Sequence, residues 1–352
     1  MSYFASIDQG TTSSRFIVFD EKGKVVAQHQ EEFPQYLPDN VSVEHSPEEI
    51  WISVENCINE VLKKVKKEEI QSIGITNQRE TTVAWSKSSG ESLCNAIVWQ
   101  DTRTQKICDD IEQKKELETE FNSTGLPIST YFSLSKIIWM MENVEAVQTA
   151  LPKGDVCFGT VDSWLLFKLT NKFLTDVTNA SRTLMYDINK LDWNDTILES
   201  FNIPRSALAE VRPSLSLFGN CVGSLEGVPI TAVLGDQQAS LFGQNCINKG
   251  GVKNTYGTGC FALTNTGNEV IQSKNGLLST IAYQYGDNKP FYALEGSVAI
   301  AGAAVQWVRD NLGLIKESSE IESLAIESED NGDVYFVPAF SGLFSPHWDQ
   351  SA

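Results

Sequence analysis

A short polar turn near the N-terminus has the residue types that hold phosphate. Two apolar runs, residues 5–7 and 16–19, flank it, and Asp8 ends the first run. Gly10 allows a tight turn, so backbone N–H groups and the next three hydroxyls can converge on phosphate oxygens; those hydroxyls belong to Thr11, Thr12 and Ser13. The Asp8 carboxylate can face a phosphate-bound Mg²⁺ directly or through water. An ordinary polar hairpin turn would fit the same residues, so the motif does not decide alone.

A second turn of this kind lies far along the chain. Residues 252–263 place Gly257, Thr258 and Gly259 between apolar flanks, after the pattern restarts around 245–251. Two similar lobes that each offer a hairpin turn would grip the phosphates of one nucleotide between them. We therefore predict two domains, residues 1–248 and 249–352.

Four polar clusters stand at the ends of apolar runs, where α/β proteins place their sites. They are residues 76–82, 98–104, 131–136 and 235–239. Each also has a plainer interpretation. Arg79 and Glu80 would serve as an exposed ion pair, Trp99 as ordinary packing, and Asp236 as the cap of a helix.

The elements that must position these clusters alternate between strand and helix. Strands are predicted on both sides of the first turn and at residues 25–30, 72–76, 82–85, 96–99 and 334–338, the last without neighbours. Helices are predicted from Pro47, where Ser46 and Glu49 form a capping-box pattern, and at 103–121, 134–143, 161–169 and within 318–333. Such alternation is typical of an α/β fold.

Composition and charge exclude several classes of protein. A formal net charge of −19 over 352 residues argues against nucleic acid or an anionic membrane as a partner. No segment supplies the roughly 20 apolar residues of a membrane span, so we expect a cytoplasmic protein. The seven cysteines include no CxxC pair, which indicates reduced thiols and no zinc site.

Several catalytic motifs are missing. The chain has no GxxxxGK[ST] and no GxGxxG after a strand. Cys221, between Gly219 and Gly223, superficially fits a nucleophile elbow, but the whole chain has only three histidines to serve as its base. Carboxylates are therefore expected to carry any acid–base chemistry.

Taken together, the polar clusters and both turns closely resemble the FGGY family of carbohydrate kinases. The family signature is similar to residues 131–143, and residues 75–82 resemble the branch that phosphorylates glycerol; residues 178–183 and 191–193 add to the match. The resemblance implies an α/β, two-lobed ATPase fold of the actin and hexokinase (ribonuclease H-like) kind. It also implies a transferase that converts glycerol and ATP into sn-glycerol 3-phosphate and ADP.

The resemblance also assigns roles to residues. Asp236 would be the general base. Glycerol would be bound by Arg79, Glu80, Trp99, Tyr131, Asp236, Gln237 and Phe261. ATP would be held by Thr11, Thr12, Ser13, Arg15, Gly257, Thr258, Gly302 and Gln306, and Mg²⁺ by Asp8 and Asp236. Partners are thus glycerol and ATP, with no nucleic acid, and a homo-oligomer stays open.

The chain departs from the family at its C-terminus. It stops within a segment, residues 340–352, that resembles another family motif, so we expect the second lobe to be incomplete. This leaves an alternative from another class, a catalytically impaired, kinase-derived protein that binds glycerol or acts through interactions. A kinase for another polyol or a ketopentose is disfavoured by the Arg79–Glu80 pair.

Overall fold

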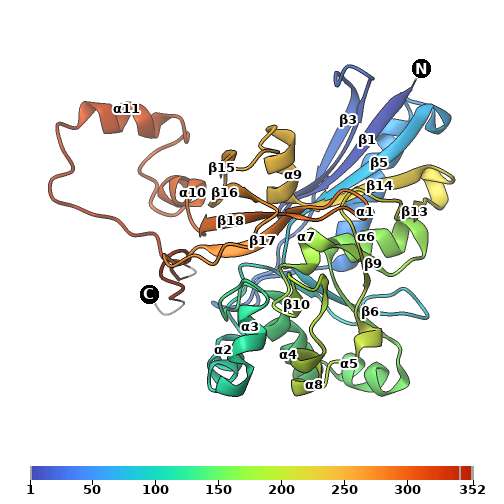
Figure 1. The fold of residues 1–352 in the computed structure, drawn as a ribbon. Coiled ribbons are helices and arrows are strands. Elements are labelled where there is room, and N and C mark those ends of the chain that lie inside the picture. Colours follow the sequence, from blue (N-terminus) through green and yellow to red (C-terminus); the bar gives the residue numbers. More distant parts are fainter. Residues whose placement is uncertain (1, 341, 350–352) are drawn as a thin grey trace.

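The computed structural model describes residues 2–340 and 342–349, and its largest sheet contains six strands (Figure 1). Their order is β13-β14-β5-β1-β2-β3. The bounds are β1 Tyr3–Gln9, β2 Ser13–Phe19, β3 Val25–Glu32, β5 Ile70–Asn77, β13 Gly219–Asn220 and β14 Pro229–Gly235. Strands β1, β5 and β14 run parallel, whereas β2 is antiparallel to both β1 and β3. The predicted hairpin around the first turn is thereby confirmed.

Alternating side chains of this sheet are buried beneath helices. In β1 and β2, Ile7, Phe16 and Val18 have no exposed surface, as period-two patterning requires. Helix α1 (Pro47–Leu62) packs on β2 and β3, and α6 (Val161–Thr170) joins the same core through Trp164, whose Nε1 donates to the Pro47 carbonyl at 2.9 Å. The predicted Ser46 cap is present, because its Oγ accepts from the Glu49 N–H at 3.3 Å.

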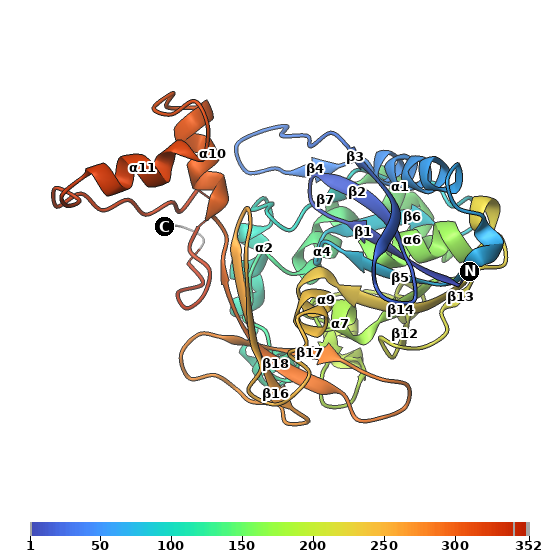
Figure 2. The same ribbon diagram turned by 90° about the horizontal axis from the view of Figure 1, so that it is seen from above.

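A second sheet is fully antiparallel, with the order β15-β16-β18-β17. Its bounds are β15 Val252–Tyr256, β16 Cys260–Gly267, β17 Leu278–Tyr283 and β18 Phe291–Val298, and α9 (Asp236–Gly243) connects the first sheet to it. The predicted second hairpin is thus confirmed as β15–β16. Helices α10 (Gly302–Asp310) and α11 (Glu320–Glu327) follow, and α11 stands away from the rest of the molecule (Figure 2). The proposed boundary at residue 248 stays a prediction.

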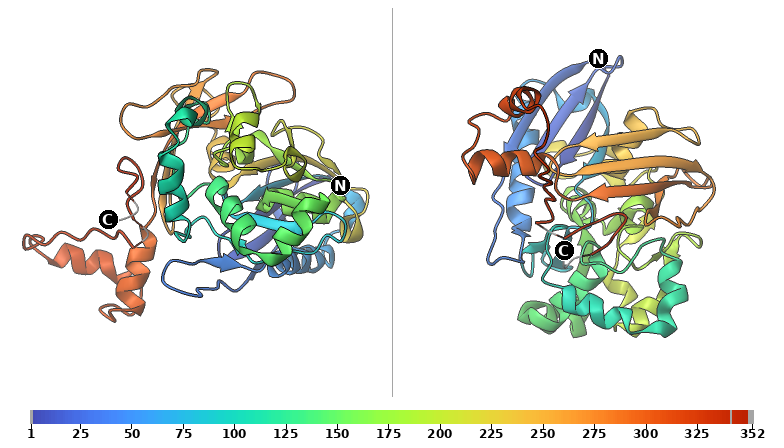
Figure 3. Two further views of the ribbon diagram at one scale, coloured as in Figure 1. Left: turned by 90° about the horizontal axis from the view of Figure 1, so that it is seen from below. Right: turned by 90° about the vertical axis from the view of Figure 1, so that its left-hand side faces the viewer.

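A third, largely helical part lies below the two large sheets in Figure 1. Its strands are β4 Glu44–His45, β6 Thr82–Ser86, β7 Ala96–Ile97, β8 Val156–Thr160, β9 Leu174–Asp176, β10 Tyr186–Asp187, β11 Asp192–Trp193 and β12 Glu210–Arg212. Its helices are α2 Gln105–Glu112, α3 Glu118–Asn122, α4 Ser133–Asn143, α5 Glu145–Ala150, α7 Val177–Ala180 and α8 Asp195–Ser200. One hydrophobic core joins this part to the second sheet, and both are seen from two further sides in Figure 3.

Two predicted elements were wrong, and a third is shorter than predicted. The helix predicted over 103–121 is broken between α2 and α3, because Lys114 leaves the helical region at ψ 69° and the chain turns to bury Leu117 and Phe121. The strand predicted over 96–99 ends at Ile97. Residues 334–338 form no strand within the described part of the chain, since an apolar run becomes a strand only where a sheet edge can pair with it.

Residues 2–340 and 342–349 contain no helix that is long and apolar enough to cross a bilayer. Cys221 is buried there, and burial raises the pKa of its thiol to about 12, so it is not a thiolate nucleophile. A buried, protonated thiol does not suit the nucleophile of such an elbow.

The contact between the helical part and the second sheet gives a test of the fold. Gly125 has φ +75°, and a Cβ there would lie 2.5 Å from the Ser279 carbonyl oxygen of β17. Gly154 has φ +69° but no atom near its Cβ position. We expect Gly154→Ala to cost about 1–2 kcal/mol of backbone strain, and Gly125→Ala to lower the thermal midpoint considerably further. Equal midpoints by calorimetry would contradict this packing.

Candidate active site

A cleft of about 190 Å³ lies where the first sheet, the helical part and the second sheet meet. All four polar clusters of the sequence contribute to its walls. The residues that line it are Thr11, Gln78, Arg79, Glu80, Trp99, Tyr131, Asp236, Gln237, Thr255, Gly257, Thr258, Gly259 and Phe261. The structure therefore brings together all seven residues predicted for glycerol and three of the eight predicted for ATP.

The parallel strands explain why distant segments meet here. Asp8 in β1 and Leu234 in β14 both lie in register with Thr76 in β5. The carboxyl ends of the three strands therefore form one edge, the usual position of a site in an α/β sheet. Arg79 follows β5 and Asp236 follows β14 directly.

Arg79 and Glu80 are buried, so an exposed ion pair is the wrong interpretation. Their side chains are each 2% exposed, although both reach the cleft. Arg79 passes close to Gly235, where a Cβ would lie 2.7 Å from the arginine Cδ. Glycine at this strand end leaves room for the Arg79 side chain, because a Cβ there would clash with the arginine methylene groups.

Four buried charges form a closed network behind the cleft. Arg79 donates to both carboxylate oxygens of Glu295 in β18, at 2.6 and 2.8 Å. Arg182 donates to Glu80 at 2.6 Å and to Glu295 at 3.3 Å. Two positive and two negative groups therefore balance where water is excluded.

The network also fixes the ionisation of its members. Burial opposes the charge of Glu295, but Arg182 and Arg79 together lower the pKa of its carboxyl to about 2. Burial raises the pKa of Glu80 above its ordinary value, while Arg182 and Arg79 offset part of that rise. Glu295 is consequently the fixed anion, and Glu80 is the carboxylate that faces the cleft.

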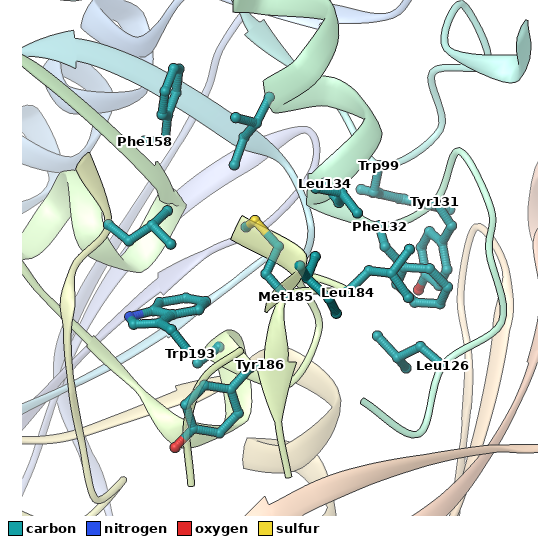
Figure 4. Packing of buried hydrophobic residues seen from close by; sticks show 14 of the residues in the cluster. Trp99, Leu126, Tyr131, Phe132, Leu134, Phe158, Leu184, Met185, Tyr186 and Trp193 are labelled. Carbon is teal, nitrogen blue, oxygen red and sulfur yellow. The ribbon is translucent and has the colours of Figure 1, made fainter. Parts of the chain in front are cut away.

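An aromatic wall borders the polar groups. The Trp99 ring lies edge-on to Tyr131 and Phe261, with centroid distances of 5.9 and 6.0 Å. Figure 4 shows Trp99 and Tyr131 close to Phe132 in the buried core. Burial raises the pKa of Tyr131, so its phenol stays protonated and able to donate. A small polyol can thus lay its carbons on the rings while its hydroxyls reach polar groups.

Asp236 is the first residue of α9 and the most exposed acid of the cleft, with 37% of its side chain exposed. Its Oδ1 accepts from the Gln237 N–H at 2.8 Å and lies 3.4 Å from Arg79 Nε. Its Oδ2 accepts from Gln237 Nε2 at 2.9 Å. Gly235 occupies the cap position, so Asp236 does not serve as the helix cap.

Both hairpin turns contribute to the same cleft. Thr11 of the β1–β2 turn accepts from Trp99 Nε1 at 3.1 Å. Gly257 and Thr258 of the β15–β16 turn are tied to the start of α10, because the Gly302 N–H donates to the Gly257 carbonyl at 2.9 Å. Each turn is therefore held in place by a contact outside its own hairpin.

Six predicted residues do not line the cleft: Asp8, Thr12, Ser13, Arg15, Gly302 and Gln306. Arg15 in β2 donates to Oε1 of Gln30, its neighbour in β3, at 2.7 Å. Gln306 lies exposed on α10. The role of Asp8 in holding Mg²⁺ and the roles of the other five in binding ATP stay predictions.

The two carboxylates assigned to Mg²⁺ suit a cation. Burial raises the pKa of Asp8 above its ordinary value, Arg15 offsets part of the rise, and the charge of Asp236 adds to it. A cation between the two acids would relieve that repulsion. Mg²⁺ is commonly held by one or two carboxylates together with substrate phosphates. The described residues contain no group of three or more His, Cys, Asp or Glu side chains around one metal position.

Sequence reasoning missed three residues of the lining, Gln78, Thr255 and Gly259, and three residues behind it. Gln78 lines the cleft and donates to the Gly10 carbonyl at 3.1 Å, so it links the phosphate turn to the Arg79 segment. Glu295, Arg182 and Lys253 support the cleft from behind. Arg182 lies within a family-like segment, residues 178–183, and that resemblance was the only signal for it.

Comparison with known proteins agrees with this geometry. Residues 3–243 match the description "FGGY family of carbohydrate kinases, N-terminal domain", and residues 252–352 match the C-terminal domain of the same family. A curated glycerol kinase of Brucella anthropi is 52% identical over 99% of this chain and 72% of its own length. One from Roseiflexus sp. is 49% identical over 99% of this chain and 72% of its own length.

Solved structures give the same result. A crystal structure of Plasmodium falciparum glycerol kinase with ADP matches with a TM-score of 0.88 and 39% identity, over 100% of this chain and 72% of that chain. A gluconate kinase from Lactobacillus acidophilus, 21% identical over 100% of this chain and 71% of that chain, shares the fold with a TM-score of 0.85. With both family domains matched and relatives near 50% identity along almost its whole length, this chain belongs to the FGGY family of carbohydrate kinases.

Proposed function

We propose that the chain is an ATP-dependent glycerol kinase, which transfers the γ-phosphoryl group of ATP to glycerol and releases sn-glycerol 3-phosphate and ADP. The observation that carries the proposal is the joint placement of Arg79, Glu80, Tyr131 and Asp236 around one small cleft. The curated glycerol kinases that match the chain support it.

Glycerol binds by its hydroxyls, since three carbons offer little apolar area. Arg79 and Tyr131 donate to hydroxyl oxygens, and Glu80 accepts from a hydroxyl proton. Trp99 and Phe261 cover the carbon chain. Because these polar groups are buried, a substrate that lacks a matching hydroxyl leaves them unpaired, which is how a site of this kind selects its ligand.

Asp236 acts as the general base. Its carboxylate accepts the proton of the attacking hydroxyl while that oxygen forms its bond to the γ-phosphorus. The bond from the γ-phosphorus to the bridging oxygen breaks, and ADP leaves. The hairpin turns at Thr11 and at Gly257 and Thr258 hold the phosphates in line, since phosphoryl transfer depends on positioning and charge stabilisation.

A bound Mg²⁺ would neutralise charge that develops on the phosphates. Asp8 and Asp236 are the residues of this chain that would hold it. Asp236 would then serve both the cation and the hydroxyl proton, which fits its exposed position at the strand edge.

A direct test measures ADP release with purified chain, ATP and Mg²⁺, offering glycerol, xylulose or gluconate in turn. ADP formed with glycerol at a kcat/KM well above that for the other two supports the proposal. A higher kcat/KM with xylulose or gluconate would show that the chain is a kinase for that substrate instead. Glycerol binding without ADP release assigns the alternative, an impaired kinase-derived protein.

Asp236→Asn keeps the shape of the side chain but cannot accept a proton. We expect kcat to fall about 10²- to 10⁴-fold, the usual contribution of a general base, while the dissociation constant for glycerol changes little. Asp287→Asn, in an exposed turn, is the control and retains kcat. A kcat within twofold of the parent would remove Asp236 from this role.

Tyr131→Phe tests recognition without breaking the charge network, whereas removing Arg79 would leave Glu295 buried and unpaired. The phenylalanine ring retains the packing of Tyr131 on Phe344 at 4.9 Å. Losing one hydrogen bond to a hydroxyl costs about 1 kcal/mol or more, so KM for glycerol should rise about fivefold or more. Tyr256→Phe, 82% exposed beside the cleft, is the control. A change confined to KM for ATP would show that Tyr131 contacts ATP and not glycerol.

Asp8→Asn tests the cation site. The amide is a weaker ligand for Mg²⁺ than a carboxylate, because it carries no charge. We expect the Mg²⁺ concentration for half-maximal velocity to rise severalfold, with KM for glycerol unchanged. Asp20→Asn, in the β2–β3 turn, is the control. An unaltered Mg²⁺ titration would place the cation elsewhere.

A further inference from the structure

Lys253 is a buried cation that the reaction described above does not use. It lies in β15, is 6% exposed, and does not itself line the cleft. None of the ion pairs found among residues 2–340 and 342–349 includes its ammonium. Burying an ammonium that contacts no carboxylate costs free energy of folding. Its presence here therefore needs a physical reason.

The ammonium donates three hydrogen bonds, and all three go to neutral oxygens around the cleft. It donates to Thr255 Oγ1 at 2.9 Å, to the Phe261 carbonyl at 3.1 Å, and to Gln237 Oε1. Those three partners belong to β15, β16 and α9, and all three residues line the cleft. Lys253 therefore fastens the second sheet to the helix that begins with Asp236.

The contact with Gln237 fixes the direction of an amide. An ammonium only donates and a carboxylate only accepts, so an amide placed between them has one possible orientation. Gln237 must turn Oε1 toward Lys253 and Nε2 toward Asp236, where it donates to Oδ2 at 2.9 Å. The Gln237 N–H holds Oδ1 at 2.8 Å, so both carboxylate oxygens are fixed by one residue.

We propose that Lys253 is a positioning residue for phosphoryl transfer: through the Gln237 amide it sets the orientation of the Asp236 carboxylate that receives the hydroxyl proton. The inference rests on the proposed role of Asp236 as general base. It adds that the base depends on a lysine that touches neither substrate, and that this lysine must stay protonated to act.

Protonation gives the proposal a signature in pH. Burial, together with the charge of Arg79, lowers the pKa of Lys253 to about 8, and Glu295, Asp236 and Cys246 offset part of that effect. A lysine that loses its proton near pH 8 gives up a donor and frees the Gln237 amide to turn. We therefore expect kcat to fall on the alkaline side as Lys253 deprotonates. Arginine remains protonated throughout this range.

The experiment compares Lys253→Met and Lys253→Arg with the parent chain. Lys253→Met keeps the length of the side chain without its donor, and we expect kcat to fall about 10- to 100-fold, as small misplacements of a catalytic group do, while the dissociation constant for glycerol changes less than threefold. Lys253→Arg should recover part of kcat and move the alkaline limb upward. Lys249→Met, which removes an exposed lysine paired with Glu269, is the control for charge.

The outcomes separate this proposal from the proposed function. If the parent chain turns over glycerol and Lys253→Met retains kcat, or Lys253→Arg keeps the parent's alkaline limb, Lys253 is not a positioning residue. If Lys253→Met does not fold, the pH profile of Lys253→Arg decides. If the parent is inactive, the proposed function fails, and a crystal structure of Lys253→Met decides the geometry: an unchanged contact between Gln237 Nε2 and Asp236 overturns the proposal.

Discussion

The pairing of Arg79 with Glu295 connects the two sheets of this protein through a buried bidentate ion pair. Arg79 follows a strand of the first sheet, and Glu295 lies in β18 of the second. An unpaired charge in the interior would be strongly destabilising. The two sheets must therefore take the relative position that brings Arg79 and Glu295 into contact. Arg182 and Glu80 extend the same constraint into the helical part. The cleft exists where these three parts meet.

This constraint explains how a site built from six separate segments keeps its geometry. The charge network fixes Arg79 and Glu80 from behind, and the aromatic rings of Trp99 and Phe261 limit the space in front. Asp236 has more exposure and is held by Gln237 and, at a further step, by Lys253. The groups proposed to recognise the substrate are thus held by buried contacts, whereas Asp236, the proposed general base, stands at the more exposed edge of the cleft.

Much of the fold could be predicted from local patterns. The hairpins around Gly10 and Gly257 and the cap at Ser46 follow from turn residues and alternating apolar positions, all of which are contiguous in sequence. The break between α2 and α3 could not be predicted, because it depends on burying Leu117 and Phe121 against distant segments. The apolar run at 334–338 satisfied strand patterning, but pairing needs a partner strand that sequence alone does not place.

The site was predicted only where its residues sit in short motifs. Arg79, Glu80 and Asp236 stand in compact polar clusters, and the resemblance of these clusters to the motifs of a family assigned their roles. Glu295 is a single acid within a strand, and its arginine partner Arg79 lies 216 positions away. In the sequence, Lys253 is a single charged residue near a predicted turn, and nothing distinguishes it from a lysine exposed to solvent. The roles of Glu295 and Lys253 depend on tertiary contacts, which the spacing of residues in the sequence does not indicate.

The most direct test is a crystal structure of this chain with glycerol at a concentration near its KM and with ADP. The account predicts one glycerol in the cleft, with two hydroxyls bonded to Arg79 and Glu80 and a terminal hydroxyl within hydrogen-bonding distance of the Asp236 carboxylate. Glycerol bound outside the cleft, or bound with its terminal hydroxyls away from Asp236, would contradict it.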